Sequence, residues 1–166
     1  MTQIIDRIDQ AIVRLLLEDG RMSSAEIARR IGEVSERSVR YRINKLLEND
    51  VIHISAIVNP KTVGLPVTAN IFIEAEPGRV LDVAQTMAEF ECVNYVACSI
   101  GERDLSVQVY SRDNEELYRF VADIIGNVPG VRKTSTMMLP LVLKDIYDWQ
   151  MPDACTVEDD EERKGT

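Results

Sequence analysis

Aromatic residues and long apolar runs are scarce in this 166-residue chain. Phe, Trp and Tyr make up 5% of the residues while hydrophobic residues make up 45%, so aliphatic side chains must fill the core. No stretch approaches the roughly 18 consecutive apolar residues that identify a membrane-spanning helix. The N-terminus, MTQIIDRIDQ, lacks the basic start and apolar run of a signal peptide. We therefore expect one or two small domains in a cytoplasmic protein without a membrane segment.

Cysteine and histidine are also rare. The three cysteines, Cys92, Cys98 and Cys155, form an odd number and contain no CxxC pair. This spacing argues against a disulfide framework and fits the reducing cytoplasm. One histidine, His53, and scattered cysteines do not make a conventional zinc site. We expect no metal and no cofactor.

Negative charge dominates the chain as a whole but not its first third. The formal net charge is −9. Residues 1–60 hold nine Lys or Arg and nine Asp or Glu, so the acidic excess lies in residues 61–166. Between Arg29 and Lys45, six basic residues accompany two acidic ones, a local charge of +4. This distribution suits binding of a polyanion by the first third, with few phosphate contacts per subunit that oligomerisation would multiply.

The basic stretch includes residues 35–49, SERSVRYRINKLLEN, whose periodicity predicts an amphipathic helix. Val39, Ile43, Leu46 and Leu47 recur at i, i+4, i+7 and i+8 and form one apolar stripe. Polar and basic side chains cover or flank the remaining surface, and they can donate to base edges and phosphates in a DNA major groove. The expected DNA-contacting residues are Ser35, Arg37, Ser38, Arg40, Tyr41, Arg42 and Lys45. The alternative is a surface helix with a solvated charged face.

Two further helices are predicted ahead of this one. Residues 6–18 repeat the helical spacing, and Gly20 follows their end. Ser23 and Glu26 form a capping-box pattern that starts a second helix ending near residue 31. Residues 51–58 are an extended β-branched run, which we interpret as a wing, with His53 facing solvent. Residues 1–59 are thus predicted to form a winged helix-turn-helix domain.

The second half of the chain has a different pattern. Residues 60–66, PKTVGLP, form a predicted linker because they contain two prolines and a glycine. In residues 67–145 the order of predicted elements is βαββαβ, a ferredoxin-like arrangement. The strands are expected at 67–76, 93–100, 104–110 and 131–143, and the helices at 79–89 and 114–125. The fold class is therefore α+β, with one sheet face left for a partner sheet or a ligand. Residues 146–166 read as an acidic, largely disordered tail.

Four segments in this order resemble one family. They are IDRIDQAIVRLLLEDGRMSSAEIARRIG and SVRYRINKLLENDVI in the first half, and GERDLSVQVYSRDNEELYRFV and VPGVRKTSTMMLPLVLKD in the second. Together they resemble the Lrp/AsnC (leucine-responsive regulator, or feast/famine) transcription factors over residues 5–145. In two places the chain departs from the family pattern. The turn from Gly32 to Ser35 is one residue longer than usual, and Asp50 replaces a glycine.

The resemblance implies a function for each half. The first half binds duplex DNA, with residues 35–45 in the recognition helix. The second half is a RAM (regulation of amino acid metabolism) domain, which pairs into homodimers that assemble further, typically to octamers. Small effectors, typically amino acids, bind between RAM domains. The implied effector-binding residues are Gly101 and Asp104 in a turn, and Thr134 and Thr136 in the last strand. Each also has a purely structural interpretation, as turn or strand residues.

These observations leave three functions open. The first is a sequence-specific transcription regulator modulated by an amino acid. The second is an architectural DNA-compacting protein of the same fold. The third is an enzyme similar to sirohaem decarboxylases, which would need a cationic pocket containing histidine. Because His53 is the single histidine and the basic residues concentrate in residues 29–45, we expect a protein that is not an enzyme.

Overall fold

The computed structural model describes residues 5–155, except for the side chains of Ile146 and Ala154. The chain divides into two compact units. One, the helical unit, comprises Met1–Ala56 with Lys144–Thr166, and the other, the sheet unit, comprises Ile57–Leu143. Residues 144–155 therefore belong with the helices. The acidic residues from 156 onward, which we expect to be disordered, lie outside the described residues.

The helical unit contains three helices, α1 (Arg7–Glu18), α2 (Ser24–Ile31) and α3 (Glu36–Glu48). Each begins at a side chain that accepts a hydrogen bond from a free backbone N–H of the first turn: Asp6, Ser23 and Ser35. The expected cap at Ser23 is confirmed. The reciprocal half of the box at Ser23 is absent, because the Glu26 carboxylate instead pairs with Arg29 and Arg30.

The core of the helical unit is aliphatic, as the shortage of aromatic residues requires. Ile12, Ile27, Val39 and Leu46 are buried where the three helices meet. The predicted apolar stripe of α3 is narrower than expected, since Leu47 is 37% exposed. Asp50 ends this region with φ 55°, the left-handed conformation that the family's glycine would take and that Asp tolerates.

The residues of the predicted wing, 51–58, do not form a strand. Residues 52–59 have no regular secondary structure and pair with no strand among the described residues. The β-branched side chains favour an extended backbone, yet a ladder also needs a partner strand for its N–H and C=O groups. Ile54 and Ile57 are exposed along this run, and His53 is exposed as expected.

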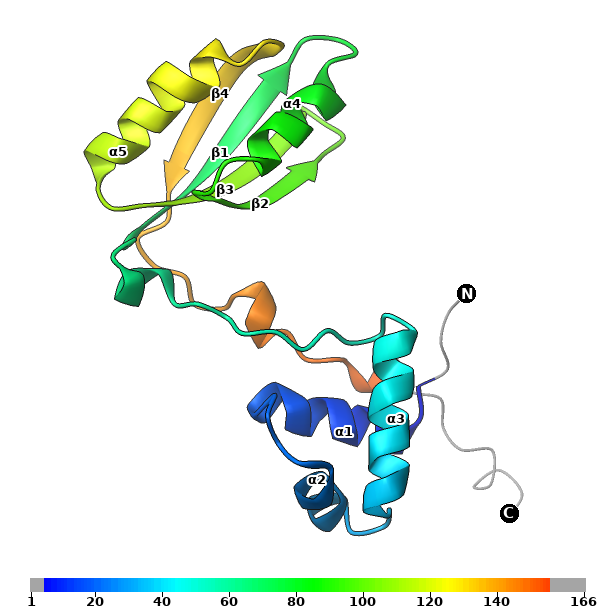
Figure 1. Cartoon of the computed structure of the whole chain (residues 1–166). Helices are drawn as coiled ribbons and strands as arrows, with labels where there is room; N and C mark the ends of the chain where they lie inside the picture. The colour runs from blue at the N-terminus through cyan, green and yellow to red at the C-terminus, as the bar shows by residue number, and fades with distance from the viewer. Residues whose placement is uncertain (1–4, 156–166) are drawn as a thin grey trace. The chain divides into compact units, whose positions relative to one another are not determined.

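The sheet unit confirms the βαββαβ order (Figure 1). Its strands are β1 (Val67–Ala75), β2 (Val93–Cys98), β3 (Leu105–Ser111) and β4 (Val131–Met138), in the antiparallel order β2-β3-β1-β4. Its helices are α4 (Val80–Ala88) and α5 (Asn114–Arg119), and α5 continues through a π turn and a 3-10 turn to Asn127. β4 is shorter than predicted because β1 begins at Val67 and offers no pairing partner beyond Leu139.

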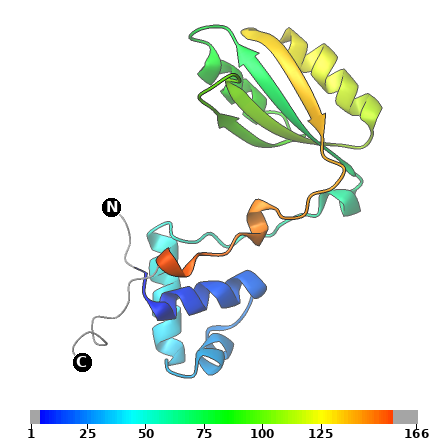
Figure 2. The same cartoon turned by 180° about the vertical axis from the view of Figure 1, so that it is seen from behind.

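Both helices of the sheet unit lie on one face of the sheet (Figures 1 and 2). The residues that alternate toward that face are buried and include Ile71 and Ile73 of β1 and Val107 of β3. The opposite face carries no helix. Its centre holds a polar chain in which Asn94 donates to Gln108 and Gln108 donates to Asn70, at 2.8 and 3.1 Å. The α+β, ferredoxin-like architecture predicted from the sequence is therefore present.

Candidate functional site

The outer surface of α3 presents cationic and polar side chains to solvent. Arg37, Tyr41 and Lys45 are exposed, Tyr41 to 68%. Across residues 5–155, neither Arg37 nor Lys45 has an ion-pair partner, so both cations are available to a ligand. Asn44, which has a neutral side chain able to both donate and accept, is also exposed. Asn44 is not among the contacts expected from the sequence, although its helical position places it beside Tyr41 and Lys45.

The side chains of two predicted contacts, Ser35 and Arg40, have other partners in the free protein. Ser35 is the N-cap of α3, and its Oγ accepts from the backbone N–H of half-buried Ser38 at 3.2 Å. Arg40 is exposed and forms an i, i+4 ion pair with Glu36 on the same helix. A surface pair of this kind is weak and is easily exchanged for a phosphate contact. Ser35 therefore begins the helix, while Arg40 remains accessible.

Arg42 was expected to contact DNA, but in the structure it contacts a neighbouring helix. Its guanidinium lies against α1, where Nη1 donates to Asp6 Oδ2 at 2.6 Å and to Asp9 Oδ1 at 2.7 Å. Its side chain is 25% exposed. Burial opposes the charge on Arg42, but the hydrogen bonds that it donates to both carboxylates outweigh this effect and raise the arginine pKa. Arg42 thus ties α3 to α1, and we remove it from the candidate DNA contacts.

The turn between β2 and β3 contains the first pair of implied effector residues. Gly101 is exposed with φ 150°, and Ser99 closes the turn by donating to the Arg103 carbonyl at 2.6 Å. The Asp104 carboxylate accepts from the Ala75 N–H at 2.8 Å, next to an irregularity in the pairing of β1 with β4. Asp104 therefore stabilises the end of β1, whatever else it binds.

The second pair lies elsewhere on the sheet. Thr134 and Thr136 of β4 pair with Ile73 and Ile71 of β1. Because β1 separates β4 from β3, these threonines are two strand spacings, about 10 Å, from the strand that follows the turn. Thr134 is half-buried and Thr136 is exposed. The four residues therefore do not form one cluster within a single chain.

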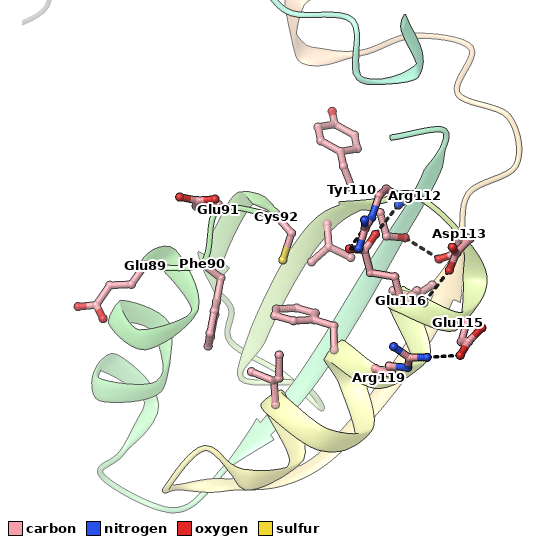
Figure 3. A pocket seen from close by; sticks show the side chains of 15 residues that line it. Glu89, Phe90, Glu91, Cys92, Tyr110, Arg112, Asp113, Glu115, Glu116 and Arg119 are labelled. Atoms are coloured by element: carbon pink, nitrogen blue, oxygen red, sulfur yellow. Dashed lines mark hydrogen bonds and ion pairs between the residues drawn. The ribbon is translucent and has the colours of Figure 1, made fainter. Parts of the chain in front are cut away.

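A cavity of about 600 Å³ lies at the other end of β2 and β3, beside α5 (Figure 3). Phe90 and Phe120 form its apolar wall, with ring centroids 5.2 Å apart in an edge-to-face contact. Burial raises the pKa of the Cys92 thiol, which also lines the cavity. Two ion pairs, Arg112–Glu116 and Arg119–Glu115, lie at its rim. None of the implied effector residues lines it, and no motif in the sequence indicated it.

Within residues 5–155, no group of three or more His, Cys, Asp or Glu side chains has the geometry to hold a metal ion. No helix there is sufficiently long and apolar to span a membrane.

Two family models match the chain, one for each unit. Residues 5–47 match the AsnC-type helix-turn-helix domain, and residues 68–147 match the Lrp/AsnC ligand binding domain. An uncharacterised HTH-type transcriptional regulator of Pyrococcus abyssi is 42% identical over 141 residues, covering 84% of this chain and 89% of the relative. These matches extend through α3 and through all four strands.

Solved structures agree with the fold. Escherichia coli AsnC superposes with a TM-score of 0.80 at 21% identity, covering 87% of this chain and 99% of AsnC. The transcriptional regulator NMB0573 of Neisseria meningitidis, solved as an L-Met complex, superposes with a TM-score of 0.76 at 23% identity, covering 86% and 92% of the two chains. With the family matches to both units, these comparisons show that the chain belongs to the Lrp/AsnC family of transcription regulators.

Proposed function

We propose that this protein is a sequence-specific transcription regulator that reads duplex DNA with the exposed face of α3. The observation that carries the proposal is a pair of cations, Arg37 and Lys45, that have no ion-pair partner among residues 5–155 and flank the exposed Tyr41 ring on a capped helix. Arginine, lysine and polar side chains at this spacing suit base edges in a major groove, while Arg40 suits a phosphate. Ser38 and Asn44 complete the proposed contact surface.

We further propose that the sheet unit binds an amino acid or a related small molecule. The match to a ligand binding domain and the L-Met complex of a protein with the same fold support this class of effector. Gly101 offers an open backbone to a carboxylate, and Asp104 has an acidic group for an ammonium. Since Thr134 and Thr136 lie two strands away from that turn, we place the complete effector site between copies of the chain.

The helix-free face of the sheet is suited to contact with a second copy of the chain. The helix-free face of the sheet carries apolar Phe72 and Met137 beside the polar chain through Gln108. We propose that this face pairs with a second copy to form a homodimer, and that dimers associate further, up to an octamer. Several α3 helices in one particle would compensate for the few phosphate contacts of each. As a DNA-bound regulator, it would act in the cytoplasm and have no catalytic role.

An architectural DNA-compacting role is the second candidate, because a multimeric basic surface also binds DNA without regard to sequence. Selecting duplexes from a random pool, and then competing the selected duplex against random DNA at fixed salt, separates the two roles. A regulator should prefer its selected site by about 10³-fold or more. Equal affinity for both duplexes would reject sequence-specific regulation and favour the architectural role.

A further inference from the structure

The segment Asp145–Cys155, here called the C-terminal clasp, returns from the sheet unit to the helical unit. Its orange to red ribbon runs beside α1 and α3 in both views (Figures 1 and 2). Met151 is half-buried and packs against the aliphatic core of the three helices. Tyr147 and Trp149 line a shallow groove with Leu17 of α1. The chain is therefore anchored a second time to the DNA-binding unit.

Polar contacts fix the last turn of the clasp. Asp153 Oδ1 accepts from Gln10 Nε2 at 3.0 Å and forms an ion pair with Arg14. Gln10 is 7% exposed, so its amide is shielded from water and depends on protein groups for its hydrogen bonds. The family match ends at residue 147, so Met151 and Asp153 both lie beyond the part of the chain that the ligand binding domain describes. The clasp contacts at Met151 and Asp153 therefore lie outside the matched domain.

The sequence after the clasp is strongly acidic. Five consecutive acidic residues, Glu158 to Glu162, begin three residues after Cys155. Counted from Asp153, the acidic run begins five and ends nine residues further on, and such segments span at most about 16 to 32 Å. The 13 residues of α3 span about 20 Å, a similar length. A chain anchored at Asp153 can therefore bring this acidic run to the surface of the helical unit.

We propose that the acidic run Glu158–Glu162 docks on the basic face of α3 when DNA is absent and competes with DNA phosphates for Arg37, Arg40 and Lys45. This inference rests on the proposed DNA-binding role of α3. Five carboxylates match a helix face whose exposed cations lack enough anionic partners within the described residues. Exposed ion pairs are individually weak, so DNA can displace the run. The clasp makes docking intramolecular and thereby raises the effective concentration of the acidic run.

Truncation tests the competition. The full chain is compared with a chain ending at Cys155 by titrating each into a labelled 30-base-pair duplex at low salt. Removing the acidic run should tighten binding by about two- to tenfold, and added salt should close the gap because salt screens the carboxylates. The control removes only residues 163–166, which carry two basic side chains and no acidic one, and it should bind DNA no more tightly than the full chain. Equal affinity of the full and truncated chains would overturn the proposal.

Release of the clasp tests the role of anchoring. Met151→Ala with Asp153→Asn in the full chain should move its affinity toward that of the truncated chain. The same substitutions in the truncated chain should leave its affinity unchanged, so any general damage to the helices is detected. An equal effect in both backgrounds contradicts the anchoring. Absence of DNA binding by the truncated chain itself would instead reject the proposed function.

A measurement without DNA locates the acidic run. Amide resonances of residues 37–45 should differ between the full and truncated chains, and the difference should vanish at high salt. Unchanged α3 resonances, even with a change in DNA affinity, would show that the run only repels DNA at a distance. That result would overturn docking on α3.

Discussion

At the scale of single residues, Arg42 shows where an amphipathic pattern stops being informative. The helical spacing places it at the border of the apolar stripe, and a basic residue there can face either DNA or a neighbouring helix. The carboxylates that decide between these directions, Asp6 and Asp9, come from α1 and are more than 30 residues away in sequence. Periodicity within one helix carries no information about such a partner. Arg37, Tyr41 and Lys45, at the centre of the polar face, were identified correctly as exposed.

We predict that Arg42→Gln destabilises the protein and that Arg40→Gln does not. Arg42→Gln leaves two half-buried carboxylates facing each other without a cation, which should lower the free energy of unfolding by about 1–3 kcal/mol. Arg40 pairs on the surface with Glu36, so its loss should be nearly neutral. Urea denaturation of both variants provides the comparison. Equal stability of the two would show that Arg42 does not tie α3 to α1.

The Asp6 carboxylate should make stability depend on pH. Burial alone would raise its pKa, but hydrogen bonds from the Asp9 N–H and from Arg42 prevail and lower the pKa below its usual 3.8. The unfolded chain therefore takes up this proton at a higher pH than the folded chain. The stabilisation from ionised Asp6 is present above about pH 4 and is lost as pH falls through the lowered pKa.

Asp6→Asn keeps a side chain that can cap α1 but removes the charge. We expect it to be less stable than wild type by about 1 kcal/mol at pH 7, with the difference shrinking below pH 4. Urea denaturation between pH 2.5 and 7 measures this difference. A difference that stays constant across that range would contradict the assigned role of the ionised carboxylate.

Asp104 has a structural contact that complicates an alanine test of effector binding. We therefore predict that Asp104→Asn, which retains an oxygen acceptor for the Ala75 N–H, keeps most of the stability while losing the response to an amino acid. Wild type and variant are compared by thermal shift against the twenty amino acids, since a ligand that binds the folded state raises its melting temperature. An undiminished shift in the variant would exclude Asp104 from the effector site.

At the scale of elements, the sequence predicted the five α-helices and the four strands of the described residues. Side-chain caps begin α1, α2, α3 and α5, and burial alternates along β1 and β3. The prediction from sequence failed at the wing. A preference for extended backbone depends on neighbouring residues, whereas strand pairing depends on a partner elsewhere in the chain. The sequence pattern also predicted too great a length for β4, because the start of β1 at Val67 limits how far β4 can pair. The cavity beside α5 brings together residues from the starts and ends of separate elements, so no single segment could have indicated it.

The connection from α5 to β4 gives a prediction at this scale. Gly130 has φ 96°, and a Cβ there would lie 2.9 Å from Arg79 Cβ. Gly130→Ala should therefore lower the free energy of unfolding by about 2 kcal/mol or more. Gly64 has a similar φ of 89° but open space around it, so Gly64→Ala should cost only about 1 kcal/mol. Chemical denaturation distinguishes the two, and an equal loss at both sites would exclude crowding against α4.

At the scale of the whole molecule, charge and function are divided between the two units. Residues 1–60 are neutral overall with a basic α3, while the acidic excess lies in residues 61–166. The sequence alone indicated this division, and the family match assigns DNA binding and ligand binding to the same two parts. It did not indicate that the chain returns to α1 through Met151 and Asp153, because that contact joins residues more than 130 positions apart.

The most direct test of the central claim is the affinity of Arg37→Ala/Tyr41→Ala for a selected duplex, measured by fluorescence anisotropy. The matched control, Arg112→Ala/Arg119→Ala, removes two exposed cations from the sheet unit. Light scattering verifies that both variants keep the wild-type oligomeric state. We expect the α3 variant to bind at least about tenfold more weakly and the control to bind like wild type. Wild-type affinity in the α3 variant would contradict the assignment of α3 as the helix that reads DNA.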